Sequence, residues 1–488
     1  MNTSTHTLPR GDVAARIAAH RFGLGEARLA TVGDDARGWL LAQVGPADLQ
    51  VGSDLASASV GLRRFAEFQQ ARRNAAASAG EADLRSAEQQ FGEHFRALVQ
   101  ADVRARMTTA ALSTRPFAER IAQFWANHFT VSMAKASARG LVGAFEREAI
   151  RPNIAGRFED LLVAAVKHAG MLRYLDNDQS AGPESRLVRR SRARAASAPE
   201  MAAPRTTGLN ENLAREVLEL HTLGVSGGGS TYGGWGGYTQ ADVTAFARVL
   251  TGWRVPLREL LAREELPKES PTRFEEAWHE PGPKPLLGKV YPEGAQALDQ
   301  VLHDLSRHPS TARFLACKLA RHFVADEPPP VLVERLARNF LANDGHLPSL
   351  YRELVEAPEA WVVEPAKLKA PDEFVVSTVR LLDLGAPAFA RQADGGVAAL
   401  GQRIQAAPSP AGWPDRADEW LGPDAVWKRV EWATRVAERS ARGLDARSLA
   451  RSSFGSTLSE ATARQLDRAA DGTQALALLL LSPEFQRR

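Results

Sequence analysis

The stretch NENLAREVLELHTLG, residues 210–224, places three glutamates, an arginine and a histidine in a segment that otherwise has the pattern of a buried helix. At about 100° per residue, Leu213, Val217 and Leu220 fall on one side, and apolar residues cover well over half of the circumference. A helix this apolar is largely enclosed, so its acids are not a simple solvated face. Enclosed carboxylates either form ion pairs or perform chemistry.

Glu216 and Glu219 share the polar arc of this predicted helix with Asn212, beside Arg215. His221 lies about 140° round from Glu216 by the same geometry. The two glutamates and His221 therefore cannot converge on one ligand, and any imidazole that faces the acids must come from another segment. We expect His221 to be a hydrogen-bonded core histidine.

Two interpretations of the glutamates stay open. In the first, arginines such as Arg215 or Arg248 pair with Glu216 and Glu219 and hold neighbouring helices in register. In the second, the glutamates belong to a functional carboxylate cluster, because acids with perturbed pKa values gather at sites.

Two histidines from remote segments could face the acids. In RPFAERIAQFWANHFTVS, residues 115–132, His128 shares a helical stripe with Phe117 and Phe124, so it should point inward. A buried neutral histidine needs partners for both ring nitrogens. His279 lies in a proline-fixed loop with Lys284 close by, and loops on a rigid scaffold often carry sites.

These residues define an enzyme hypothesis. Carboxylate and imidazole together suit zinc, manganese or non-haem iron inside a helix bundle, for a hydrolytic or oxidative reaction, and they equally suit an acid–base set without metal. The predicted metal ligands are His128, Glu216, Glu219 and His279, and the predicted catalytic set adds Lys284 and Arg215.

The elements that must position these residues are helices. Apolar residues recur at helical spacing, whereas alternating runs are almost absent, which predicts an all-α, multi-helix globular bundle with long irregular loops and no substantial sheet. We expect one helical domain over residues 11–488. Residues 182–207 are basic and lack an apolar period, which predicts a mobile insert. Thr239 and Asp242 resemble a capping box. Predicted helices include 84–112, 116–130, 210–223, 240–252 and 310–324.

Composition excludes several classes of protein. Apolar residues make up 44% and charged residues 24%, as in an ordinary soluble globular protein. The 61 basic and 58 acidic residues are interspersed, so nucleic acid is not an expected partner. The single cysteine, Cys317, rules out an intrachain disulfide and a CxxC site. No run of 18 apolar residues and no secretory signal occur, so we expect no membrane span and a cytoplasmic start.

Several motifs together resemble the bacterial domain-of-unknown-function family 1800, from residue 11 to residue 488. The most specific is the NENxARExxELxTLG string followed by a helix that ends in TGW. The motifs are RFGLGE at 21–26, FWANHFTVS at 124–132, MLRYLDNDQS at 171–180, LNENLAREVLELHTLGV at 209–225, YTQADVTAFARVLTGW at 238–253, WHEPGPKPLLGK at 278–289 and SPEFQRR at 482–488.

The resemblance implies a helical protein to which no activity is attached. Members are commonly encoded beside a companion of the domain-of-unknown-function 1501 class, which resembles sulfatases and phosphatases and often carries a twin-arginine signal. The family usually has His-Asp where this chain has His279 and Glu280, and its glycine loop is shorter. The family's recurring polar positions correspond to His128, Asn210, Glu211, Asn212, Arg215, Glu216, Glu219, Asp242, Arg248, His279 and Lys284.

The resemblance also supports an alternative to the enzyme. The chain would be a non-catalytic assembly or binding module that acts with this companion, the glutamates would form an ion-pair lattice, and the glycine loop and residues 278–289 would form the docking face. Glu216→Gln would then lower the free energy of unfolding by a few kcal/mol. Export bound to a signal-bearing companion would place the chain in the periplasm instead of the cytoplasm.

Overall fold

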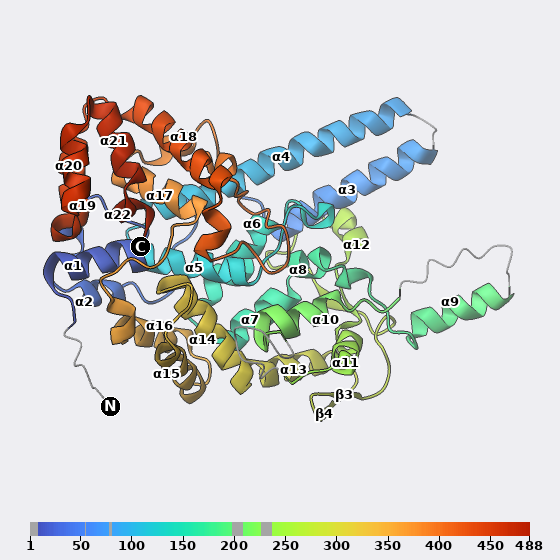
Figure 1. Ribbon diagram of the computed structural model, residues 1–488. Coiled ribbons are helices and arrows are strands. Elements are labelled where there is room, and N and C mark those ends of the chain that lie inside the picture. Colours follow the sequence, from blue (N-terminus) through green and yellow to red (C-terminus); the bar gives the residue numbers. More distant parts are fainter. Residues whose placement is uncertain (1–7, 54, 78–80, 198–207, 226–236) are drawn as a thin grey trace.

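Helices dominate the computed structural model (Figure 1). Strands are confined, within the described part of the chain, to two antiparallel two-stranded sheets. These observations confirm the all-α prediction. None of the described helices combines the length and the apolar content needed to cross a bilayer. The structure describes residues 8–53, 55–77, 81–197, 208–225 and 237–488.

The first half of the chain supplies helices around a central α5. A projecting hairpin of α3 and α4 is held by stacked rings, with Phe68 and Phe91 3.8 Å apart between centroids. The helices are α1 (Gly11–Arg16), α2 (Ala36–Leu41), α3 (Ala58–Ala77), α4 (Glu81–Leu112), α5 (Pro116–His128), α6 (Val142–Phe145), α7 (Phe158–Lys167), α8 (Ala169–Tyr174), α9 (Arg186–Ser197), α10 (Asn212–Glu216) and α11 (Gln240–Leu250).

The second half adds a small hairpin and a helical C-terminal part. The strands are β1 (Trp253–Arg254), β2 (Arg273–Phe274), β3 (Lys284–Leu286) and β4 (Lys289–Tyr291). The helices are α12 (Leu257–Ala262), α13 (Gln296–Ser306), α14 (Pro309–Phe323), α15 (Pro330–Ala342), α16 (Leu347–Glu356), α17 (Pro371–Leu381), α18 (Pro423–Ser440), α19 (Ala446–Phe454), α20 (Glu460–Arg468), α21 (Gly472–Leu481) and α22 (Pro483–Gln486).

Buried apolar side chains form two clusters. The larger one joins α1, α2, α5 to α8, α10, α11 and α13 to α16. The smaller one joins the second half of α4 to α17 and to the C-terminal helices, which lie together at one end of the molecule beside α1 (Figure 1). Polar side chains of α5, α14 and α17 meet where the two clusters adjoin.

Local sequence signals explain how α5, α11 and α14 begin. Pro116 and Pro309 occupy first helical positions, where a missing N–H costs nothing. Thr239 and Asp242 form the predicted capping box of α11, with Thr239 N–H donating to the Asp242 carboxylate at 2.8 Å. These starts fix which side chains of each helix face inward.

The helix of the NEN motif is not regular. After α10 it widens into η8 (Val217–Thr222), a π-helical segment in which Leu223 N–H reaches back to Leu218 O. A π-helix has more residues per turn than an α-helix, so the 100° geometry no longer applies beyond Val217. Such segments are frequent at functional sites.

Within the segment 182–207, which was predicted to be an insert, Arg186–Ser197 form α9, and this helix projects from the body (Figure 1). Residues 198–207, like most of the glycine-rich loop at 226–236, lie outside the described residues.

Candidate active site

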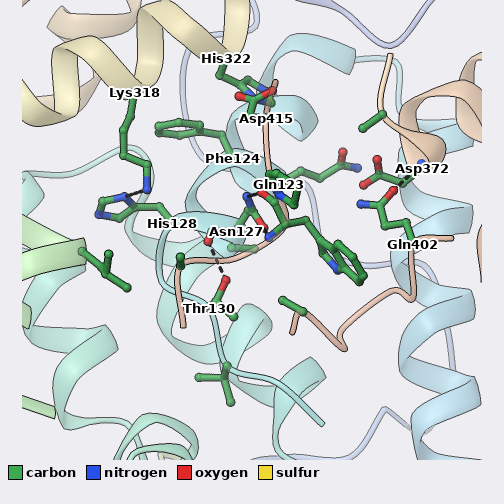
Figure 2. A pocket seen from close by; sticks show the side chains of 18 of the residues that line it. Gln123, Phe124, Asn127, His128, Thr130, Lys318, His322, Asp372, Gln402 and Asp415 are labelled. Carbon is green, nitrogen blue, oxygen red and sulfur yellow. Dashed lines mark hydrogen bonds and ion pairs between the residues drawn. The ribbon is translucent and has the colours of Figure 1, made fainter. Parts of the chain in front are cut away.

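A cavity of about 340 Å³ lies between the two apolar clusters. Its wall comes mainly from α5, α6, η8, α14, the first turn of α17 and the loop 402–416, with a few residues from other segments. Figure 2 shows Lys318 and His128 on one side, and Asp372 and Gln402 on the other. A volume of this size suits a small organic molecule. The titratable residues of the wall are Arg106, His128, Glu146, Glu219, Lys318, Arg321, His322, Asp372, Glu373, Asp415 and Arg416.

Lys318 and His128 form a hydrogen-bonded pair in this wall. Lys318 Nζ donates to His128 Nδ1 at 3.0 Å, and His128 Nε2 donates to the His221 carbonyl at 3.2 Å. These partners place the imidazole proton on Nε2 and the lone pair on Nδ1. His128 is buried, whereas Lys318 is half-buried and reaches the cavity.

Burial shifts both groups toward their neutral forms. It lowers the pKa of Lys318 to about 8, against a smaller opposing effect of Asp415. Burial also holds the pKa of His128 well below its ordinary value, and the Lys318 charge lowers it further. No carboxylate of the described residues forms an ion pair with Lys318. The amine therefore has one described hydrogen-bond partner, and that partner is neutral.

A second imidazole in the wall is held by a carboxylate. His322 Nδ1 donates to Asp415 Oδ2 at 2.9 Å, and Asp415 also lies 3.3 Å from Lys367 Nζ. Burial alone would raise the pKa of Asp415, but His322, Lys367 and Arg488 together lower it well below the ordinary range. Asp415 is therefore a permanent anion that orients His322.

Glu373, which lines the cavity at the start of α17, belongs to a buried ion triad. Glu373 pairs with Arg120 and, at 2.9 Å, with Arg488. Burial alone would raise the pKa of Glu373, but the two guanidinium groups lower it to about 2. Gln402 Oε1 accepts from the Asp372 N–H at 2.8 Å. These groups are engaged in holding the wall.

Of the six predicted site residues, His128 and Glu219 line the cavity. Glu216, Arg215, His279 and Lys284 lie outside it. Arg215 pairs with Glu211 at 3.3 Å and not with either predicted glutamate. The helix of the NEN motif thus delivers one of its two central acids to the cavity.

His279 and Lys284 form a second histidine–lysine pair. Lys284 Nζ donates to His279 Nε2 at 2.8 Å and to the Glu280 carbonyl at 2.6 Å. His279 Nδ1 donates to the Thr251 carbonyl at 2.8 Å, and Gly294 N–H also donates to Nε2 at 3.2 Å. Both side chains are buried, so this pair is fully engaged in joining the loop to the end of α11.

Glu216 is half-buried and has no hydrogen bond or ion pair to the described residues. Burial raises its pKa to about 7, the neighbouring charge of Glu219 adds to this shift, and Arg215 opposes it. Neither Arg215 nor Arg248 holds it, so the ion-pair interpretation has no described partner for this acid.

His221 is buried, as expected for a core histidine, but its imidazole forms no hydrogen bond with the described residues. Its two ring nitrogens have no partner among the described residues. Burial lowers its pKa to about 3, and the Lys318 charge contributes. His221 contributes its carbonyl, which fixes the proton on His128.

Residues 17–487 match the model of a family described as a protein of unknown function, DUF1800. The chain belongs to this family. The match is near full length and confirms the resemblance drawn from the motifs. Comparisons with curated proteins and with solved structures found no match. Membership of the DUF1800 family therefore does not identify an activity.

The recurring DUF1800 positions do not assemble a metal centre among the described residues. No group of three or more histidines, cysteines, aspartates or glutamates is placed there so that it could hold a metal ion. Each ring nitrogen of His128 and of His279 already has a hydrogen-bond partner. The titratable groups that this DUF1800 cavity offers are an amine, two imidazoles, carboxylates and guanidinium groups.

Sequence reasoning missed Lys318 and Asp415, and it treated His322 as scaffold. A signal was present in RFLACKLARHF, residues 313–323 of the DUF1800 chain, where Lys318 and His322 are four residues apart on an otherwise apolar helix. Side chains four apart share a face, so a lysine and a histidine there should enter the interior together. Asp415 follows a proline in an irregular loop and gave no such signal.

Proposed function

We propose that this DUF1800 protein is an acid–base enzyme that acts on a small polar molecule bound in the cavity. Lys318 is the group that exchanges a proton with the substrate, and His128 orients it. The observation that carries the proposal is the Lys318 amine, which faces a cavity of about 340 Å³ without a described ion-pair partner. The predicted acid–base alternative is thereby favoured, with Lys318 in place of His279 and Glu216.

The pKa of Lys318 suits this role. With a pKa of about 8, roughly a tenth of the amine is neutral at pH 7, compared with well under a thousandth for an ordinary lysine. A base is most effective when its pKa lies near the working pH. Glu219 adds a half-buried carboxyl to the same wall.

The test is a conversion assay on a panel of small esters, amides, hydroxy acids and keto acids, followed by proton NMR. We expect the wild type to convert at least one class, Lys318→Met to lose that conversion, and Lys268→Met to keep it. Lys268 is an exposed lysine in a loop, so it is a matched control. A folded wild type that converts nothing, or a fully active Lys318→Met variant, would contradict the proposal.

An assembly role beside a DUF1501-class companion is the second candidate, and α9 favours it. Arg189, Arg190 and Arg194 are exposed on this projecting helix and have no ion-pair partner among the described residues (Figure 1). A basic arm of this kind fits an acidic surface.

Co-expression with the companion tests this second role. Replacing the three arginines with glutamate should weaken co-purification, and Lys318→Met should leave it intact. Fractionation of cells with and without the companion would separate a cytoplasmic location from co-export to the periplasm. Equal co-purification of both variants, at physiological salt, would speak against α9 as the docking arm.

A further inference from the structure

We propose that the Lys318 amine is also a nucleophile, which forms an imine with a small aldehyde or ketone held in the cavity. This inference rests on the proposed function, because it names the carbonyl group as the substrate class of the same site. It differs in requiring a covalent bond to Nζ.

The surroundings of Lys318 favour a neutral, reactive amine. Its Nζ lies 5.5 Å from the centroid of the Phe314 ring, and Phe124 forms the adjoining wall. A buried ammonium is normally stabilised by a carboxylate, and none of the described carboxylates pairs with this one. An aromatic face compensates for only part of the lost hydration.

His128 directs the nitrogen lone pair. Because Nε2 donates to the His221 carbonyl, Nδ1 can only accept, and it takes one N–H of Lys318. When the amine is neutral, one N–H of Lys318 still donates to His128 Nδ1. The lone pair of Nζ must therefore point away from the imidazole. Lys318 lines the cavity, so a carbonyl compound bound there could meet this lone pair.

The reaction balances without a further reactant. The lone pair attacks the carbonyl carbon, a C–N bond forms and the carbonyl π electrons move to oxygen. One proton passes from nitrogen to that oxygen to give a carbinolamine. The nitrogen lone pair then forms the C=N bond as the C–O bond breaks. The second nitrogen proton passes to the departing hydroxyl group, so the products are the imine and one water. Nothing is oxidised or reduced.

The ionisation of Lys318 sets the pH range of this reaction. The charged and titratable groups that act on it are His128 from α5, His221 from η8 and Asp415 from the loop 402–416. Both imidazoles stay neutral above pH 6.5, and Asp415 stays charged. The amine is therefore the only one of these four groups that titrates between pH 7 and pH 9.

Reductive trapping of the intact wild type tests the proposal. The protein is treated with limiting glyoxylate and cyanoborohydride from pH 6 to pH 10, and the carboxymethyl adduct on each lysine is quantified by peptide mass spectrometry. We expect Lys318 to be trapped at least about tenfold faster than exposed Lys268 at pH 7.5, with a midpoint near pH 8. In guanidinium-unfolded protein this advantage should disappear.

Equal trapping of Lys318 and Lys268 in the folded protein, or a midpoint above pH 10 at Lys318, would overturn the inference. The result is separable from the proposed function. If substrate conversion requires Lys318 but Lys318 is not trapped faster than Lys268, the acid–base proposal stands and the nucleophile proposal is wrong. If wild-type Lys318 is trapped faster than Lys268 but the Lys318→Met variant keeps full conversion, the nucleophile proposal stands and the acid–base role is wrong.

Discussion

Two histidine–lysine pairs occur in the part of the chain that the structure describes, with nearly the same contact distance and different surroundings. Lys284 and His279 meet at 2.8 Å, and Lys318 and His128 meet at 3.0 Å. In the first pair Lys284 also donates to the Glu280 carbonyl. In the second, Lys318 has no other described hydrogen-bond partner and borders the cavity.

The different surroundings separate a lysine that serves the structure from one whose amine is accessible from a cavity. Lys284 closes a loop onto the end of α11 and does not line this cavity, although its loop position and its family motif made it the more obvious candidate. Lys318 lies on an apolar helix that looked like scaffold. The proposed reactivity of Lys318 depends on the ion-pair partners that it lacks among the described residues, and a sequence motif does not reveal such an absence.

Lys284→Met should have the largest effect on stability. The change leaves His279 Nε2 and the Glu280 carbonyl with fewer donors in a buried place, so we expect the free energy of unfolding to fall by about 2 to 4 kcal/mol. Urea denaturation at pH 7 measures it. The control is Lys289→Met in the same hairpin, where an exposed pair with Asp304 should be worth under about 1 kcal/mol. If both variants lose the same free energy of unfolding, the buried pair contributes no more to stability than the exposed one.

His221→Phe should change the response to acid. The folded-state pKa of His221 is about 3 and the unfolded value is 6.5, so between these values the unfolded chain binds the proton and stability falls as the pH falls. Removing the imidazole should reduce this loss by up to about 1.4 kcal/mol per pH unit below pH 6.5. Denaturation curves from pH 7 to pH 4.5 measure it. The backbone carbonyl that fixes His128 remains, so trapping at Lys318 should not change. Parallel curves for variant and wild type would refute this account of His221.

Much of the fold was predictable because it depends on local spacing. The apolar stripes at 116–130 and 310–324 correspond to α5 and α14 within two residues. The segment 182–207 was harder, because it has no apolar face and yet Arg186–Ser197 is helical. Arginine and alanine favour a helix through their intrinsic propensity, without any packing.

The site was predictable only where one helix determined it. The inward direction of His128 followed from its stripe, but its partner Lys318 comes from 190 positions later in the chain, which no spacing rule can reach. The NEN helix failed in another way. The π-helical segment Val217–Thr222 changes the angle per residue, and of the two glutamates only Glu219 lines the cavity.

Glu216→Gln distinguishes this arrangement from the ion-pair lattice. The folded-state pKa of about 7 lies above the ordinary 4.5, so stability falls as the pH rises through this interval. At pH 8 the variant should be more stable than wild type by roughly 1 kcal/mol, a modest value because water screens a half-exposed carboxyl. The gain should vanish near pH 4.5. Glu211→Gln is the control. The Glu211 carboxylate accepts hydrogen bonds from Thr244 and Gln240, so this variant should be less stable than wild type. If Glu216→Gln instead lowers the free energy of unfolding by a few kcal/mol, the ion-pair interpretation is correct.

Lys318→Met should have the smallest effect on stability, within about 1 kcal/mol of wild type at pH 7. The variant loses the hydrogen bond to His128 Nδ1, but it also removes a cation that has no paired carboxylate among the described residues, and these two terms offset one another. Urea denaturation beside Lys284→Met gives the direct comparison. A loss as large as that of Lys284→Met would make Lys318 a second structural lysine and would remove the reason to assign it chemistry. A stable Lys318→Met variant without conversion would mean that this buried amine is retained for what it does in the cavity.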